Sequence, residues 1–208
     1  MIKAKLFKIF SLYLPPLIKK DFLMKKIALL SILFISLGAK AATPTSQDVL
    51  MQLVKNAHGG VELVKIDGQT SYRGYVGTGY QYFFYKEKAY VKPEIDVRWG
   101  EIRYKNNTDN HYVKTTSIAV PVTVGYNVFQ QDLIGMNIFG GVRFEQILNS
   151  SNKNFETKIN NSQIGLTGGA SMRLMNKFSV NASYFYGLTS LFNDGTGKMS
   201  AFSFSFNF

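Results

Sequence analysis

The 208-residue chain has no cysteine, one tryptophan and five prolines, and it has no apolar run long enough for a membrane-spanning helix. The absence of cysteine excludes disulfides and thiolate metal sites. The longest mainly apolar run, residues 27–37, has eleven residues, whereas a helix needs about 20 to cross a bilayer. The sequence therefore excludes a disulfide-stabilised scaffold and a bundle of transmembrane helices.

Acidic residues are also scarce, with 13 Asp and Glu against 24 Lys and Arg and a net charge of +11. The excess is concentrated in residues 1–41, which hold eight lysines and one aspartate. The rest of the chain carries 16 basic and 12 acidic residues and has no basic stripe of the kind that nucleic-acid-binding proteins present. We therefore expect no nucleic-acid partner.

Glycine and aromatic residues are abundant, with 18 Gly, 17 Phe and 12 Tyr. This composition is typical of β-rich proteins, and the length suits one domain. The mean hydropathy of -0.03 is neutral. A neutral average is what a transmembrane barrel gives, because lipid-facing and lumen-facing residues alternate along each strand.

Residues 24–41 contain the parts of a secretory signal peptide. Two lysines come first, the apolar run 27–37 follows, and Ala39-Lys40-Ala41 forms a small-residue cleavage site. We expect the mature protein to begin at Ala42 and to be exported. Residues 1–23 precede this complete signal, and we interpret them as a mis-assigned start or as an extended n-region.

Residues 42–58 form a periplasmic leader ahead of the first strand. Ser46 can cap a short helix, and apolar side chains then recur at helical spacing. This helix either leads into the first strand or packs under or inside the barrel.

The last eleven residues alternate between large apolar and small polar side chains, a period of two that predicts a strand. Phenylalanines occupy one face, up to the terminal Phe208. The same alternation recurs from residue 59 onward and predicts eight strands, at 61–66, 72–85, 90–104, 112–129, 133–148, 162–175, 178–188 and 198–208.

The predicted connections alternate in length. Tight turns fall at 86–89, 130–132 and 176–177, and longer polar loops at 105–111, 149–161 and 189–197, with 67–71 as a short member of the second set. Short turns at the end that carries both termini, with long loops at the other, are typical of outer-membrane barrels with periplasmic turns and external loops.

The predicted strand 90–104 separates the two faces. Its odd positions are apolar, and its even positions include Lys92, Glu94, Asp96 and Arg98. A soluble ligand-binding barrel would place the apolar face inside, but the lumen of eight strands is barely wide enough for side chains. We therefore predict an all-β fold, an eight-stranded antiparallel up-and-down transmembrane β-barrel in the cell outer membrane, and keep the soluble periplasmic barrel as an alternative.

Two positions disturb this pattern. The alternation slips at Gly100-Glu101, and a β-bulge there would let Ile102 and Tyr104 continue the apolar outer face. Pro121 removes a backbone donor inside a strand, so we expect a bulge or a bridging water beside it.

Several segments carry a family resemblance. The run 118–126, with its internal proline and closing tyrosine, resembles the small outer membrane protein beta-barrel domain family (OmpA/OmpX-like eight-stranded barrels), as do Gly140-Gly141, Gly168-Gly169, the run 184–188 and terminal Phe208. The resemblance covers residues 59–208 and implies fold and compartment. It also implies that the barrel assembly machinery recognises Phe208.

Charged residues on the inward face form the candidate site. By parity these are Lys92, Glu94, Asp96, Arg98, Arg143, Glu145 and Arg173, with Arg73 beside them. Glu94 and Asp96 lie about 6.6 Å apart along a strand face, close enough for acid–base chemistry. An interior salt-bridge network is the better interpretation of so many paired charges.

The alternative is an enzyme at the external rim that acts on lipid or peptide. His111 would serve it, with Asp109 and Asn110 beside it and Thr115, Thr116 and Ser117 nearby in sequence, although such residues are also ordinary loop composition. His58 lies in the leader without a metal-spaced partner. We expect neither a cofactor nor a metal.

The predicted function is structural or interactive. The barrel, expected to be monomeric and without a wide pore, would be anchored by outer-membrane lipid. It would present its loops, in the manner of an adhesin, to an extracellular ligand.

Overall fold

The computed structural model describes residues 46–85, 88–106, 109–131, 133–151, 159–175, 178–192 and 195–207. The chain divides into two units, Met1–Thr45 and Ser46–Phe208. The predicted signal peptide and the question of the start codon lie outside the described residues, as does Phe208.

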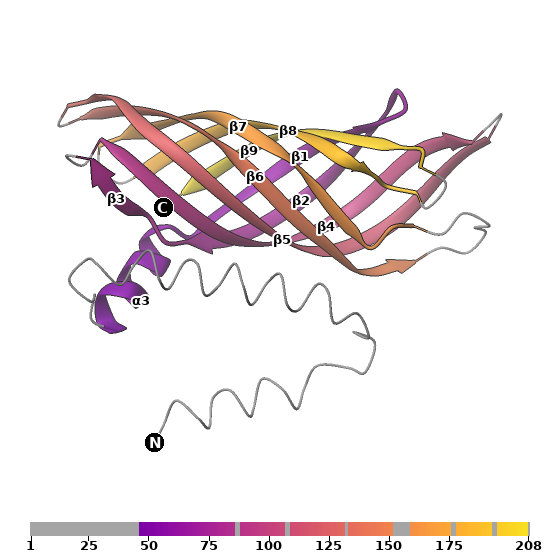
Figure 1. Cartoon of the computed structure of the whole chain (residues 1–208), viewed down its shortest axis with the longest axis horizontal. Helices are drawn as coiled ribbons and strands as arrows, with labels where there is room; N and C mark the ends of the chain where they lie inside the picture. The colour runs from indigo at the N-terminus through magenta and orange to yellow at the C-terminus, as the bar shows by residue number, and fades with distance from the viewer. Residues whose placement is uncertain are drawn as a thin grey trace, which may run out of the picture. The chain divides into compact units, whose positions relative to one another are not determined.

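The second unit is one short helix followed by strands (Figure 1). The elements are α3 (Ser46–Lys55), β1 (His58–Ile66), β2 (Gln69–Gly79), β3 (Tyr82–Tyr85), β4 (Ala89–Asn106), β5 (Asp109–Gln130), β6 (Ile134–Ser151), β7 (Ser162–Leu174), β8 (Phe178–Ser190) and β9 (Lys198–Asn207). Among the described residues no helix is both long enough and apolar enough to span a membrane.

The strands close into an antiparallel barrel. Strands adjacent in sequence pair with each other, except that β2 pairs with β4 and not with β3, and β1 pairs with β9 to close the barrel. The short β3 follows β2 and pairs with the same β4, so the two form one wall. The predicted eight-stranded antiparallel barrel is confirmed.

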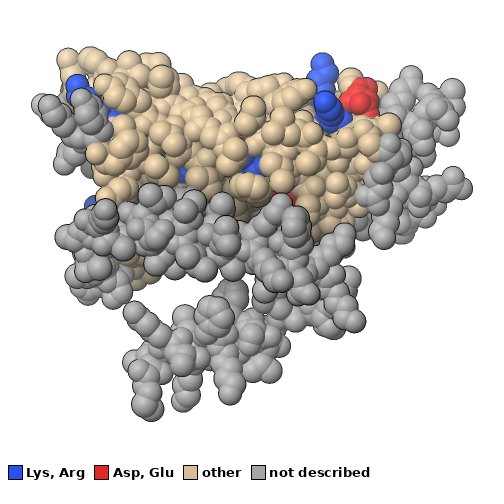
Figure 2. All heavy atoms as spheres, viewed as in Figure 1, with Lys and Arg blue, Asp and Glu red and all other residues tan. Residues whose placement is uncertain are grey.

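Strand β9 shows why these residues form a barrel wall. Phe202, Phe204 and Phe206 are exposed on the outside, whereas Ser203 and Ser205 are buried on the inside. The same division holds around the wall, and Figure 2 shows that uncharged residues cover most of the visible barrel, with charged ones gathering toward its ends. Apolar groups outside and polar groups inside suit a lipid solvent.

The strands differ in length. β9 has 10 residues and β5 has 22, and β4 and β6 have 18 each. The predicted loop 105–111 is for the most part strand, because β4 continues to Asn106 and β5 resumes at Asp109 (Figure 1). The predicted loop was too long because a strand that extends past the lipid carries polar side chains on both faces. Its composition is then similar to that of a loop.

Two ends of the barrel can be distinguished. The turns at 86–88, 131–133 and 175–177 lie at the end where β1 begins and β9 finishes, and we call this the periplasmic end. The connections at 67–68, 107–108, 152–161 and 191–197 lie at the opposite, external end.

The bulge predicted at Gly100 is wrong. The β4–β5 register runs without a shift through Trp99↔Thr116, Gly100↔Thr115 and Glu101↔Lys114. Ile102 and Tyr104 accordingly face inward and are buried. Gly100 is required for a different reason: its φ is 154°, and a Cβ there would lie 2.5 Å from the Tyr72 carbonyl oxygen of neighbouring β2.

The bulge predicted beside Pro121 is also absent. The β4–β5 pairing is interrupted at Glu94 and Ile95 and resumes in the same register at Asp96↔Ala119. Register shifts occur instead in the β5–β6 pair, between Thr116 and Ser117 and between Asn127 and Phe129. Pro121 has no backbone N–H to donate, and the sheet accommodates this by leaving Glu94 and Ile95 of β4 unpaired with β5.

The external end of the lumen contains an apolar core. It consists of Val64, Ile66, Ile102, Tyr104, Val113, Ile147, Ile159, Phe185, Leu191, Phe192, Met199 and Ala201. Along β4 the inward side chains change from charged, as at Asp96 and Arg98, to apolar, as at Ile102 and Tyr104. In the sequence this change has the same appearance as a slip of the alternation at Gly100.

Two external connections cover this core. The Asn160 amide donates to the Leu191 carbonyl at 2.7 Å, and Ile159 forms an isolated bridge with Phe192. A Cβ on Gly197, whose φ is 72°, would lie 2.6 Å from the Phe192 ring. Leu191 and Phe192, which follow β8, are therefore packed into the external end of the lumen.

Candidate functional site

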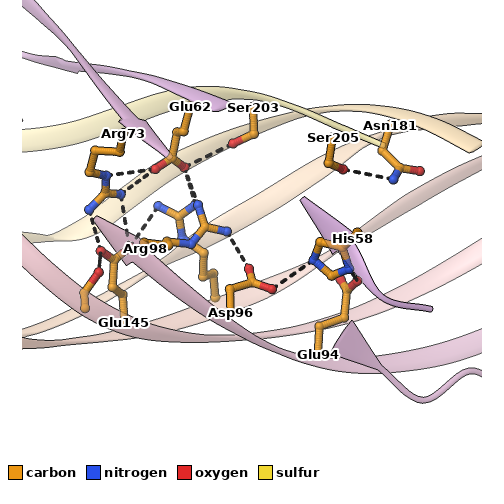
Figure 3. Close-up of polar contacts among 12 residues, drawn as sticks. His58, Glu62, Arg73, Glu94, Asp96, Arg98, Glu145, Asn181, Ser203 and Ser205 are labelled. Carbon is orange, nitrogen blue, oxygen red and sulfur yellow. Dashed lines mark hydrogen bonds and ion pairs between the residues drawn. The ribbon is translucent and has the colours of Figure 1, made fainter. Parts of the chain in front are cut away.

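Glu62 of β1 lies at the centre of the lumen (Figure 3). Its carboxylate accepts hydrogen bonds from Arg73 (2.5 and 3.0 Å), from Arg98 and Arg143 (2.7 and 2.6 Å), and from the Ser203 hydroxyl at 3.1 Å. The Glu62 side chain is completely buried. One carboxylate from the first strand thus joins arginines of β2, β4 and β6 and a serine of β9.

Glu145 of β6 is the second carboxylate of the cluster. It accepts from Arg73 Nη1 at 2.6 Å and from the Ser117 hydroxyl at 2.7 Å. Arg143 Nη2 lies 3.2 Å from Glu145 Oε2 and so adds charge attraction, but without the alignment of a hydrogen bond. Asp96, the third carboxylate, pairs with Arg98 at 2.6 Å.

These six residues form what we call the lumen ion-pair network: Glu62, Arg73, Asp96, Arg98, Arg143 and Glu145. It contains three acids and three bases, each exposed by 4% or less. Charges removed from water are tolerated only when they are paired and hydrogen-bonded, and this arrangement meets that condition. The network therefore fills the middle of the lumen.

Two contacts connect the network to its neighbours. The Arg143 guanidinium carbon lies 3.5 Å from the centroid of the Phe185 ring, which belongs to the apolar core. Toward the periplasmic end, His58 Nε2 lies 3.0 Å from Asp96 Oδ1, and His58 Nδ1 lies 3.0 Å from the Asn56 carbonyl oxygen. Side-chain contacts thus connect the apolar core, through the network, to the start of β1.

The predicted lumen charges fall into three groups. Asp96, Arg98, Arg143 and Glu145 belong to the network, together with Arg73. Lys92 and Glu94 pair with each other at 2.7 Å nearer the periplasmic end. Arg173 lies apart and forms no ion pair with any described residue.

Four residues that contact these charges were not predicted to do so: His58, Glu62, Ser117 and Ser203. Glu62 lies within the predicted strand 61–66, and because Val61 and Leu63 on either side of it are exposed, ordinary alternation places it inside. His58 was assigned to the leader, whereas it begins β1, opposite Gly77 and Asn207.

Two of the hydroxyl residues proposed for a rim enzyme do not lie at the exposed rim. Thr115 and Ser117 are buried inside the barrel, and Ser117 is bound to Glu145. The side chains of Asp109, Asn110 and His111 lie outside the described residues. Ser117 is six residues from His111 on an extended strand, a separation of about 20 Å.

The helix α3 lies at the periplasmic end. Its Leu53 carbonyl accepts a short hydrogen bond from the Thr78 hydroxyl of β2. Leu50, Met51 and Val54 are exposed, so α3 does not fill the lumen. Within the described ranges no group of three His, Asp or Glu side chains could hold a metal ion.

A closed eight-stranded barrel with an apolar exterior and a charged interior has the architecture of an outer-membrane β-barrel. The family model for the outer membrane protein beta-barrel domain matches residues 50–193, and the chain belongs to this family. It is located in the outer membrane, so the alternative of a soluble periplasmic barrel is wrong.

Among curated proteins no sequence matches the chain. The similar solved structures include the outer membrane enzyme PagL (13% identity, 72% of this chain and 97% of that chain, TM-score 0.49). They also include Ail of Yersinia pestis in complex with the heparin analogue sucrose octasulfate (13% identity, 73% of this chain and 97% of that chain, TM-score 0.40). A third is the N-terminal β-barrel domain of Pseudomonas aeruginosa OprF (15% identity, 74% of this chain and 98% of that chain, TM-score 0.35). At such low identity these likenesses concern the fold alone.

Proposed function

We propose that the protein is a closed outer-membrane anchor that presents rigid external hairpins to partners outside the cell. The observation that supports this most strongly is the filled lumen. An apolar core covered by the β8–β9 connection lies above a fully paired ion network, and both are buried. A barrel of eight strands has little room for water once such side chains fill it.

The external extensions support a presenting role. A transmembrane strand needs about 9–11 residues, and β5 has 22, so the β4–β5 hairpin continues well beyond the lipid. The hairpin stays paired to Asn106↔Asp109. A paired hairpin is a stiffer support for binding than an open loop, because less conformational entropy is lost when a partner binds.

The proposed function is not enzymatic. The hydroxyl groups of Thr115 and Ser117, near His111 in sequence, are buried inside the barrel, and that of Ser117 is bound to Glu145. Neither is therefore exposed at the rim as a nucleophile would need to be. We expect the His111→Ala variant to leave the lipid composition of the outer membrane unchanged, as measured by mass spectrometry of extracted lipid. A lipid species that depends on His111 would overturn this part of the proposal.

We further propose that the barrel is a monomer, since a closed sheet has no free edge to pair. Assembly is proposed to depend on terminal Phe208, recognised by the barrel assembly machinery.

Cysteine labelling of intact cells tests the presentation of the external end. The chain has no cysteine, so a single one can be placed at exposed Lys198, at the external end of β9, or at exposed Lys88, in a periplasmic turn. We expect a membrane-impermeant maleimide to label Lys198→Cys on intact cells and Lys88→Cys only after lysis.

The reverse pattern would show that the barrel is inserted the other way and that 105–111, 149–161 and 189–197 do not face outside. Equal labelling of both variants on intact cells would contradict a sealed, oriented anchor. The cysteine-free wild type is the control for background.

A further inference from the structure

The helix α3 has an apolar face that the barrel leaves uncovered, and we call it the α3 face. Its three side chains are exposed by 63%, 59% and 67%: Leu50, Met51 and Val54. Leu50 and Val54 are one turn apart and Met51 borders them, whereas Val49 and Gln52, on the opposite side of the helix, are partly buried. Contiguous exposed apolar side chains, unlike scattered ones, mark a surface that meets a partner or a membrane.

The helix is attached to the outer side of the barrel wall. The Leu53 carbonyl accepts its hydrogen bond from the Thr78 hydroxyl of β2. In the β2–β4 register Gly77 lies opposite Asp96 of the lumen, and Thr78 lies opposite exposed Ile95. Residues opposite one another share a face of the sheet, so Thr78 points outward. The α3 helix therefore contacts the side of the wall that meets lipid, at the periplasmic end (Figure 1).

The lipid-facing surface continues on both sides of this contact. Phe84 of β3 and Phe206 of β9 are exposed. β3 pairs with residues 89–91 of β4, which lie nearer the periplasmic end than Ile95 does, and Phe206 lies opposite Gly59 of β1. The strands on either side of β1 and β2 thus carry exposed aromatic side chains at this level, so the α3 face lies at the periplasmic border of the lipid.

The end of α3 lies at the mouth of the lumen. Lys55 and Asn56 line a cavity of about 310 Å3 in the periplasmic half of the lumen, and His58 is buried there. The chain thus passes from the outer side of the wall to the mouth just after Leu53. The ten residues of α3 span only about 15 Å, about half of a bilayer core, so the helix cannot cross the membrane and can only lie along its surface.

We propose that α3 is an interfacial anchor whose apolar face is covered by phospholipid of the periplasmic leaflet. Leu50, Met51 and Val54 lie among the upper parts of the acyl chains, as the apolar side chains of surface-bound amphipathic helices do. Lys55, exposed at the edge of this face, extends its ammonium group to the lipid phosphates. The barrel's lipid-facing surface and the α3 face then form one continuous apolar surface. This assignment is independent of the loop-presenting role proposed above.

The test uses the exported form that begins at Ala42, refolded into phospholipid vesicles, so that the apolar run 27–37 is absent. The chain has no cysteine, so one fluorophore can be attached at Met51→Cys on the α3 face, at Phe204→Cys on the lipid-facing wall, or at Lys198→Cys at the external end. Brominated phospholipid quenches a fluorophore among acyl chains, and iodide on both sides of the membrane quenches one in water. We expect the Met51 label to be quenched by brominated lipid, as the Phe204 label is, and to be protected from iodide, unlike the Lys198 label.

A matched pair of double variants then tests the α3 face itself. Leu50→Asp with Val54→Asp, added to Met51→Cys, should abolish quenching by brominated lipid and expose the label to iodide. Leu50→Ile with Val54→Leu keeps the face apolar and should behave as Met51→Cys alone. The gel shift on heating verifies that the barrel has formed in each variant. If the aspartate variant does not form a barrel, the comparison of the Met51 label with the Phe204 and Lys198 labels decides.

Three results would overturn the proposal. The first is a Met51 label that iodide quenches as readily as it quenches the Lys198 label. The second is quenching by brominated lipid that the two aspartates leave unchanged. The third is protection from iodide that appears only at a high ratio of protein to lipid, which would assign the α3 face to a contact with a second copy of the chain.

Discussion

Glu62 accepts from three arginines, so its removal would leave three buried cations with too few acceptors. Arg73 would keep Glu145 and Arg98 would keep Asp96, whereas Arg143 would retain only the imperfectly aligned contact with Glu145. Breaking a buried pair by deleting one partner is costly, because the remaining charge stays out of water.

Replacement of Glu62 by Gln should therefore lower the free energy of unfolding by about 3–5 kcal/mol. The measurement is urea unfolding of the refolded barrel, followed by the gel shift between folded and heated protein. The control is Glu101→Gln, whose partner Arg103 lies 3.3 Å away on the exposed surface, and its cost should stay below about 1 kcal/mol. Similar costs for the two variants would contradict the central role of Glu62.

The sequence predicted which charged residues face the lumen better than it predicted which of them pair with one another. Alternation assigned Arg98 and Glu145 to the inside, because parity along a strand depends only on the chain itself. It could not show that Glu62 is the common acceptor, because that depends on the register of β1 with β2 and β9. Ser117 and Ser203, as small residues on inward faces, carried no distinguishing pattern.

At the scale of the element, β9 shows how strongly the sequence of a single strand determines which of its faces meets the lipid. Phe204 lies opposite Val61 of β1 and Ala182 of β8, and it is exposed on the lipid side. A shift of one residue would place every phenylalanine in the lumen and every serine in lipid. The apolar face therefore excludes a register shift of one residue.

The Phe204→Arg variant should lose about 2–4 kcal/mol of stability, the cost of a cation facing the middle of a bilayer. Unfolding in phospholipid vesicles measures this loss. Phe204→Leu retains an apolar side chain and should cost less than about 1.5 kcal/mol. An arginine tolerated as well as leucine would mean that this face of β9 is not in lipid.

Strand ends were the least predictable part of the elements. The polar residues at 105–111 suggested a loop, yet most of them are strand. Ile102 and Tyr104 suggested a bulge, yet they enter the apolar core. Both errors have one cause: outside the lipid and at the sealed end of the lumen, the two faces of a strand no longer have the polarity that they have within the bilayer.

At the scale of the whole molecule, the lumen has three parts along the barrel: an apolar core at the external end, the ion-pair network in the middle, and a cavity at the periplasmic end. The number of strands, their antiparallel order and the barrel itself followed from the alternation and from connection lengths. The filling of the lumen did not, because it depends on which side chains from different strands meet.

The most direct test of a closed anchor is the electrical conductance of the refolded barrel in a planar lipid bilayer. The filled lumen predicts no steady single-channel current at moderate voltage, in a membrane where a wide porin added afterwards conducts. Insertion must be verified in the same vesicles by the gel shift on heating. Stable, uniform channels from the inserted wild-type protein would contradict the closed lumen and with it the proposed role.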